Sequence, residues 1–147
     1  MVKPLDTYVN NGNPEVLSAI PPQAHKILDL GCGAGNNARI YNGPSAIWDG
    51  VTISREEAEV AKQYYRNVVL FNLENGLPGQ GLDGDYDACI CSHVIEHIVW
   101  PGKLIHDVGE VLTANRGTLV MAIPNAVNHL IRSKFARGKF EDRKSVV

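Results

Sequence analysis

Three glycines at alternate positions follow an apolar segment that carries one acidic residue, in the sequence ILDLGCGAGN at residues 27–36. Because Gly31, Gly33 and Gly35 have no side chains, a ligand can lie against the main chain at this turn. A helix opening after the turn would present free N–H groups to polar or anionic ligand atoms. A dinucleotide fingerprint would need its third glycine where this chain has Asn36, so the spacing argues against NAD. The pattern predicts a nucleotide-binding turn of another kind.

A second pattern with chemical potential is HVIEH at residues 93–97. On a helix, this HxxEH spacing would place His93, Glu96 and His97 on one face, as zinc peptidases of the inverted type require. The motif is short and permissive, and a peptidase would need a further ligand and a larger cleft. We therefore expect no resident metal here.

The elements that must position these residues alternate between short apolar runs and amphipathic segments, which predicts an α/β fold around a parallel sheet. Ser54 and Glu57 form a predicted capping box at the start of one helix, each side chain satisfying the backbone donor of the other. Strands are expected at residues 26–30, 46–52, 67–71, 86–91 and 118–123, helices at 14–20, 33–41, 55–65 and 102–112, and a glycine-rich loop at 76–84.

Composition favours one domain over residues 1–147, because 44% of the residues are hydrophobic and only 20% are charged. No apolar run approaches the roughly 18 residues of a membrane span, and the N-terminus lacks a signal-peptide core, so we expect a cytoplasmic protein. Three cysteines, an odd number, indicate reduced structural thiols. Residues 132–147 form a basic tail of net charge +4, whereas the preceding residues carry −6. No aromatic stacking pattern accompanies the tail, which argues against a nucleic-acid partner.

Three segments, ILDLGCGAG, YDACICSHVIEHI and the IPN after the last predicted strand, resemble class I, Rossmann-like S-adenosylmethionine (SAM) dependent methyltransferases of the small-molecule type. The resemblance implies a doubly wound, mostly parallel sheet of order 3-2-1-4-5, SAM as cofactor, and methyl transfer to a small-molecule acceptor that the sequence does not identify. Only 24 residues follow Ile123, too few for the antiparallel strands that complete this fold. A truncated domain, or one completed by a partner chain or a second copy, is therefore expected.

The resemblance also implies positions for the cofactor. Thr52 stands where the family usually has an acidic residue that grips both ribose hydroxyls, and its neutral hydroxyl is a weaker partner than a carboxylate. Asp49, three residues earlier, is a candidate substitute. Asn72 replaces a common aspartate at the adenine amino group, where an amide oxygen can still accept a hydrogen bond. The implied contacts are Asp29, Gly31, Gly33 and Gly35 at the methionine part, Thr52 and Ile53 at the ribose and adenine, Asn72 and Leu73 at the adenine, and Ser92 and His93 near the sulfonium.

If the acceptor must lose a proton, His93 is the first candidate general base and His97 the second. Two alternatives stay open. Some RNA ribose methyltransferases resemble this chain in a Glu-His pair that helps to bind a divalent metal, here Glu96 and His97, with His129 as a third ligand. A non-catalytic SAM-binding or assembly module would explain the missing strands and Thr52. Other candidates are assigned to structure: Trp48 and Trp100 to packing in the core or at an interface, and His25 and His106 to the surface.

Overall fold

The computed structural model of the chain describes residues 11–125 and residue 136. Within them, five strands form one sheet in the order β3-β2-β1-β4-β5, and every neighbouring pair is parallel. This confirms the doubly wound α/β fold. The strands are β1 (Lys26–Leu30), β2 (Ile47–Thr52), β3 (Asn67–Leu70), β4 (Ala88–Ser92) and β5 (Thr118–Ala122). The helices are α1 (Pro14–Ser18), α2 (Asn36–Ile40), α3 (Arg55–Ala61) and α4 (Pro101–Thr113), with short 3-10 turns η1 (Leu73–Asn75) and η2 (Ile95–His97).

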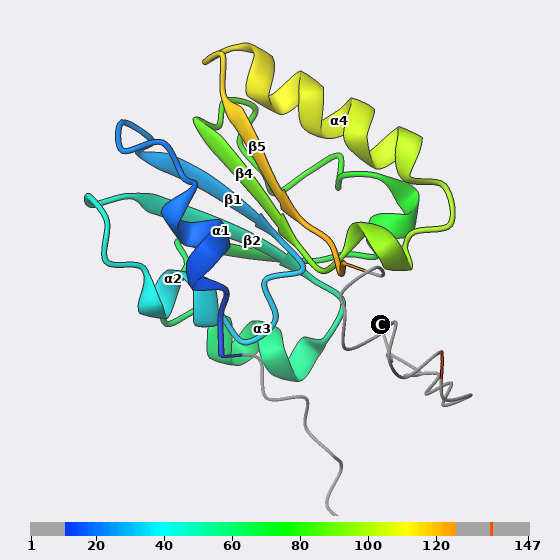
Figure 1. Cartoon of the computed structure of the whole chain (residues 1–147), viewed down its shortest axis with the longest axis horizontal. Helices are drawn as coiled ribbons and strands as arrows, with labels where there is room; N and C mark the ends of the chain where they lie inside the picture. Colours follow the sequence, from blue (N-terminus) through cyan, green and yellow to red (C-terminus); the bar gives the residue numbers. More distant parts are fainter. Residues whose placement is uncertain (1–10, 126–135, 137–147) are drawn as a thin grey trace, which may run out of the picture.

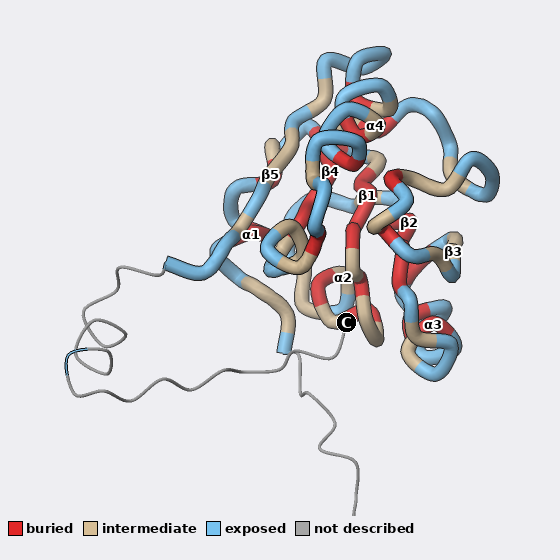
Figure 2. Tube along the Cα trace, turned by 90° about the vertical axis from the view of Figure 1, so that its right-hand side faces the viewer, coloured by how far each residue is buried: buried red, intermediate tan, exposed pale blue. Residues whose placement is uncertain are grey.

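The helices lie on both faces of the sheet, with α4 over one face and α1, α2 and α3 over the other (Figure 1). Side chains of β1 alternate between the two layers: Ile27 belongs to the core on the α1 side, and Leu28 and Leu30 belong to the core on the α4 side. Burial on both faces explains why β1 reads as an almost continuous apolar run. Figure 2 shows the buried residues concentrated in the central strands, with β5 much more exposed.

The helix α4 is held to the sheet by an apolar stripe in which Leu104, Val108 and Leu112 are buried. Ile105, in the same helix, is instead 44% exposed. Together with Met121 of β5, it lines a small apolar hollow between α4 and the sheet.

The helix after the first strand starts later than predicted. Gly33 has φ 51° and Gly35 has φ 87°, both in the left-handed region, and α2 begins only at Asn36. A left-handed residue cannot continue a right-handed helix. The prediction of a helix at 33–41 was wrong at its N-terminal end, because these glycines form a wound turn instead of the first helical turn.

No helix among residues 11–125 is long and apolar enough to cross a membrane. Cys32, Cys89 and Cys91 are buried and unpaired. Burial is the main cause that raises the pKa of the Cys91 thiol, to about 11, so the thiols stay protonated and act as small apolar groups. This confirms the predicted structural role of the cysteines.

Candidate functional site

The glycine turn lies where the topology of the sheet reverses. From β1 the chain runs to β2 and β3 on one side, then returns to β4 and β5 on the other. In open α/β sheets, ligands bind outside the carboxyl ends of the strands at such a switch point. The turn that starts at Gly31 follows β1 directly, and Thr52 and Ser92 end the two neighbouring strands. The fold thus brings the glycine turn, Thr52 and Ser92 to one edge of the sheet.

Each of the three glycines meets a different neighbour. A Cβ at Gly31 would lie 2.5 Å from the Cγ2 atom of Val94, and one at Gly35 would lie within 3.1 Å of Ala61 and Tyr65. These two glycines permit close packing of the turn. At Gly33 the nearest atoms are the carboxylate oxygens of Glu57, 3.7 Å from the Cβ position. The sequence predicted one purpose for all three glycines, whereas only Gly33 faces a polar group at this edge.

Behind the turn, Asp29 is completely buried. Its Oδ2 accepts hydrogen bonds from the Tyr65 hydroxyl at 2.6 Å and from the Asn37 amide at 3.1 Å. Among the described residues, nothing hydrogen-bonds its Oδ1. Burial raises the pKa of the Asp29 carboxyl to about 6, although the hydrogen bonds from Tyr65 and Asn37 lower it. An unsatisfied buried carboxylate oxygen is costly unless a donor reaches it.

A hydrogen-bonded chain joins Asp29 to the end of β4. The Oδ1 atom of Asn37 accepts from the backbone N–H of Asn13 at 2.9 Å, and the Asn13 amide donates to the Ser92 hydroxyl at 2.9 Å. Asn13 also caps α1, where its side chain accepts from the Val16 N–H. Sequence reasoning missed Asn13 and Asn37 as parts of the site. An asparagine before Pro14 does signal a helix cap, but it does not reveal a partner 79 residues away.

The end of β2 is arranged differently from the prediction. The Ser54 hydroxyl accepts from the Glu57 N–H at 3.2 Å, which confirms one half of the capping box. The other half is wrong: the Ser54 N–H donates to the Thr52 hydroxyl at 3.3 Å, and that hydroxyl donates to the Glu57 carboxylate at 3.4 Å. Glu57 therefore faces the site and is, after Asn13 and Asn37, a third site residue that the sequence analysis missed. The capping motif did single out Glu57, but it predicted the Ser54 N–H as the partner of the carboxylate, whereas the partner is the Thr52 hydroxyl.

The predicted adenine contacts lie next to this position, since Thr52 pairs with Leu70 at the ends of β2 and β3. Ile53 is 48% exposed. Asn72 is exposed as well, and its Oδ1 accepts from the Glu74 N–H at 3.0 Å to cap η1. Leu73 is only 7% exposed and packs into the core on the α4 side. The side chains of Ile53 and Asn72 are thus open to a ligand, and that of Leu73 is not.

The HxxEH segment does not form the helix on which its zinc interpretation depended. His93 has a left-handed φ of 55°, and η2 begins only at Ile95. His93 and Glu96 still lie close, with Nδ1 and Oε1 3.4 Å apart. Within residues 11–125, no three His, Cys, Asp or Glu side chains are grouped to hold a metal, and His129 lies outside the described residues. His93, Glu96 and His97 therefore do not share one helical face, which the zinc alternative would have required.

Asp49 does not substitute at the ribose. It is 1% exposed, accepts from Arg66 through both carboxylate oxygens, and accepts from the Tyr86 hydroxyl at 2.8 Å. Asp83 accepts from the same guanidinium at 2.7 Å and extends the network. These partners hold Asp49 in place within the fold, so this candidate is wrong.

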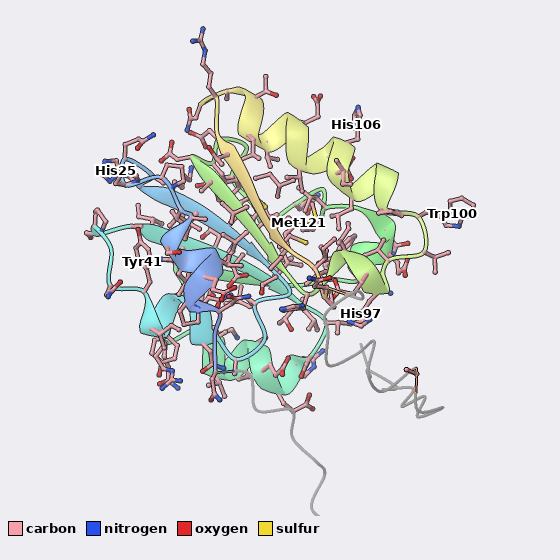
Figure 3. The ribbon with its side chains drawn as sticks, in the orientation of Figure 1. His25, Tyr41, His97, Trp100, His106 and Met121 are labelled. Carbon is pink, nitrogen blue, oxygen red and sulfur yellow. The ribbon has the colours of Figure 1, made fainter. Side chains whose placement is uncertain are left out.

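The remaining single residues follow the predictions with one exception. Trp48 is buried and forms edge-on ring contacts with Tyr41 and Tyr65, and His25 and His106 are on the surface. Trp100, predicted to pack in the core or at an interface, is 79% exposed and points away from the body of the domain (Figure 3), so it is not part of the core. The basic tail, residues 132–147, lies outside the described residues apart from residue 136.

Fold and site together define a Rossmann-like nucleotide-binding domain with a carboxylate-lined glycine turn. A sequence profile of the methyltransferase domain family matches residues 7–144, and the chain belongs to this family. A search of curated proteins found no match. The family membership confirms the SAM-dependent methyltransferase class that the resemblance of the three segments implied, and it implies SAM as the cofactor.

Solved structures agree with this fold. The PH0226 protein of Pyrococcus horikoshii OT3 superimposes with a TM-score of 0.63 at 20% identity, over 86% of this chain and 58% of that one. YcgJ of Bacillus subtilis gives 0.53 at 25% identity, over 67% and 44%. An O-methyltransferase of a trans-AT polyketide multienzyme of Brevibacillus brevis, in complex with S-adenosyl-L-homocysteine (SAH), gives 0.51 at 22% identity, over 67% and 36%. The chain thus spans about a third to three fifths of these structures.

Proposed function

We propose that this chain binds SAM at the turn from Gly31 to Gly35 and takes part in methyl transfer to a small-molecule acceptor. The main observation in support of the proposal is a pair of carboxylates around this turn. Asp29 lies in β1, just before the turn, and Glu57 lies next to Gly33. The sulfonium and ammonium groups of SAM are cationic, so carboxylates attract them. The pyrophosphate of a dinucleotide would be repelled by the same two groups.

The residues present fit the cofactor in two further respects. The ammonium of its methionine part is a donor of the kind that the unpaired Oδ1 of Asp29 lacks. Ile53 and Asn72, which follow the ends of the paired strands β2 and β3, offer an exposed apolar side chain and an exposed amide, which suits a planar base with an amino group at its rim. Gly33 leaves the main chain free of a side chain at the same edge.

When bound, SAM supplies an activated methyl group that passes in line from its sulfur to an oxygen, nitrogen or carbon nucleophile. The protein then has to align donor and acceptor and exclude water. The bonds from Asn13 to Ser92 and to Asn37 fix the end of β4 against the start of α2, where Asn37 also binds Asp29.

His93 is the proposed general base for an acceptor that must lose a proton. Its ring is 49% exposed and its Nδ1 lies 3.4 Å from Glu96, which leaves Nε2 to accept the proton. A left-handed φ at a residue other than glycine or asparagine is strained, and such strain clusters at functional sites. His97 is the second candidate. The small-molecule nature of the acceptor is supported by the resemblance of the motifs and by the polyketide O-methyltransferase among the similar structures.

The test combines calorimetric titration with SAH and transfer of a labelled methyl group from SAM to a panel of small phenols, amines and carboxylic acids. We expect SAH binding, and transfer to at least one class that falls at least about 100-fold in His93→Ala. Binding without transfer to any acceptor, RNA included, would favour the SAM-binding module. Absence of binding by folded protein would contradict the proposal.

A further inference from the structure

The hydroxyl of Ser92 lies at the end of β4, on the α1 side of the sheet. Ile90, two residues earlier and so on the same face of the strand, belongs to the core on the α1 side. The Ser92 hydroxyl accepts from the Asn13 amide at 2.9 Å, and the serine is half-buried. The next residue is His93, the proposed general base. A polar group of fixed surroundings thus stands beside the residue that would take the proton of an acceptor.

The side-chain amide of Asn13 has a defined orientation. Its Oδ1 accepts from the backbone N–H of Val16 at 3.2 Å, and a backbone N–H can only donate. The other end of the amide, the Nδ2 atom, is therefore the end that faces Ser92. The backbone of Asn13 is held as well, because its N–H donates to the Oδ1 atom of Asn37 at 2.9 Å. Ser92 thus meets a donor, held in place by two other bonds.

The proton of the Ser92 hydroxyl is left for another partner. A hydroxyl has one proton and two lone pairs, and the bond from Asn13 uses a lone pair. Among the described residues, none accepts a hydrogen bond from Ser92. The hydroxyl is therefore set to donate to a ligand at the strand end where His93 can accept a proton.

We propose that the Ser92 hydroxyl donates a hydrogen bond to the nucleophilic atom of the acceptor and so selects an oxygen nucleophile, with Asn13 as the residue that positions the hydroxyl. This inference rests on the proposed function. A neutral amine has a single lone pair, which must point at the methyl carbon, so it has none left to accept from Ser92. A hydroxyl or carboxylate oxygen has at least two lone pairs, and it can accept this hydrogen bond while it reacts.

In transfer to a hydroxyl acceptor, one lone pair of the acceptor oxygen forms the bond to the methyl carbon. The bond from that carbon to sulfur breaks, and its electron pair stays on sulfur. The acceptor proton passes to Nε2 of His93, while the Ser92 proton stays on the serine. The hydrogen bond from Ser92 strengthens as the acceptor oxygen loses its proton, because hydrogen bonds to an ionised oxygen are about twice as strong as neutral ones. A carboxylate acceptor is already ionised and needs only the donor.

The test compares transfer of a labelled methyl group from SAM to the fastest oxygen acceptor of the panel and to the amine with the same carbon frame. Ser92→Ala removes the donor, and Ser92→Thr keeps it. Asn13→Asp keeps an oxygen for the Val16 N–H but presents a second acceptor to the serine, which then donates its proton to the carboxylate. The control is Ser18→Ala, which removes an exposed hydroxyl that donates to the Glu15 carbonyl.

We expect the wild type to methylate the oxygen acceptor at least about tenfold faster than the amine. Ser92→Ala and Asn13→Asp should lower kcat for the oxygen acceptor at least about tenfold, and any transfer to the amine by less than about threefold. Ser92→Thr should keep most of the wild-type rate, and Ser18→Ala all of it. Asn13→Asp should have no further effect in the Ser92→Ala background, because a positioning residue acts only through the group that it positions.

Calorimetric titration with SAH accompanies each variant and separates this inference from the proposed function. Every variant should bind SAH within about threefold of the wild type, so that lost transfer is not lost folding. Failure of the folded wild type to bind SAH, or SAH binding without transfer to any acceptor, contradicts the proposed methyl transfer and the inference with it. Faster transfer to the amine than to the oxygen acceptor, or an equal loss for both acceptors in Ser92→Ala, contradicts the inference alone.

Discussion

The buried carboxylate of Asp29 should make the stability of the fold depend on pH. Burial raises its pKa to about 6, against 3.8 for an exposed aspartate. The Asp29 carboxyl is therefore more readily protonated in the folded state than in the unfolded state. The stabilising contribution is fully present below pH 3.8 and is lost as the pH rises through 6. The difference between the two pKa values corresponds to about 3 kcal/mol of unfolding free energy.

The perturbation that isolates this effect is Asp29→Asn. Asparagine keeps an oxygen that can accept from Tyr65 and Asn37, and it does not titrate. The altered packing of the asparagine changes the free energy of unfolding by the same amount at every pH. The informative quantity is therefore how the difference in stability between variant and wild type changes with pH. We expect the stability of the variant relative to the wild type to rise by about 2 to 3 kcal/mol between about pH 4 and pH 8.

The assay is urea unfolding followed by circular dichroism at both pH values. The control is Glu59→Gln, whose exposed carboxylate should leave the pH profile almost unchanged. With saturating SAH the pH dependence should become smaller, because a donor at Oδ1 favours the ionised form of Asp29. A stability difference between variant and wild type that is constant with pH, or that falls as the pH rises, would refute this reasoning.

Three further substitutions test the packing around the site by urea unfolding. Gly35→Ala should lose about 1 to 3 kcal/mol, because φ is 87° and the added Cβ would meet Ala61 at 3.1 Å; unchanged stability would show that the turn relaxes freely. Gly109→Ala, inside α4 with nothing within 4 Å of the added Cβ, should gain about 1 kcal/mol, and a loss would contradict the described helix. Arg66→Ala should lower the free energy of unfolding by about 2 kcal/mol, because it leaves Asp49 buried with fewer hydrogen-bond donors. Unchanged stability would show that this network does not stabilise the fold.

The fold could be predicted from the sequence because β1 and β4 are buried on both faces and read as short apolar runs between turn residues. The order of the strands followed from the family resemblance and not from the runs themselves. Helix boundaries were less predictable. The late start of α2 depends on left-handed torsion angles at Gly33 and Gly35, and a glycine in a sequence does not reveal which of its allowed conformations the fold selects.

The parts of the site that lie within one segment of the sequence could be predicted. The parts that form where distant segments meet could not. The glycine turn could be recognised from local spacing alone. Glu57 was recognised as a capping residue, but the partner of its carboxylate is Thr52, because the folded strand end competes with the local cap. Asn13 could not be assigned to the site, since its partner Ser92 lies 79 residues away. The spacing of HVIEH would suit a helical face, but the left-handed torsion at His93 precludes a helix that includes all three residues, and the spacing alone does not reveal this torsion.

The most direct test of cofactor binding at the glycine turn is a titration of ¹⁵N-labelled protein with SAH, followed residue by residue in amide NMR spectra. The account predicts the largest shift changes at the amides of Gly31, Gly33 and Gly35, with further changes at Glu57 and at Ser92. Shift changes confined to the hollow between α4 and β5, or no change at millimolar SAH in a well-dispersed spectrum, would contradict it.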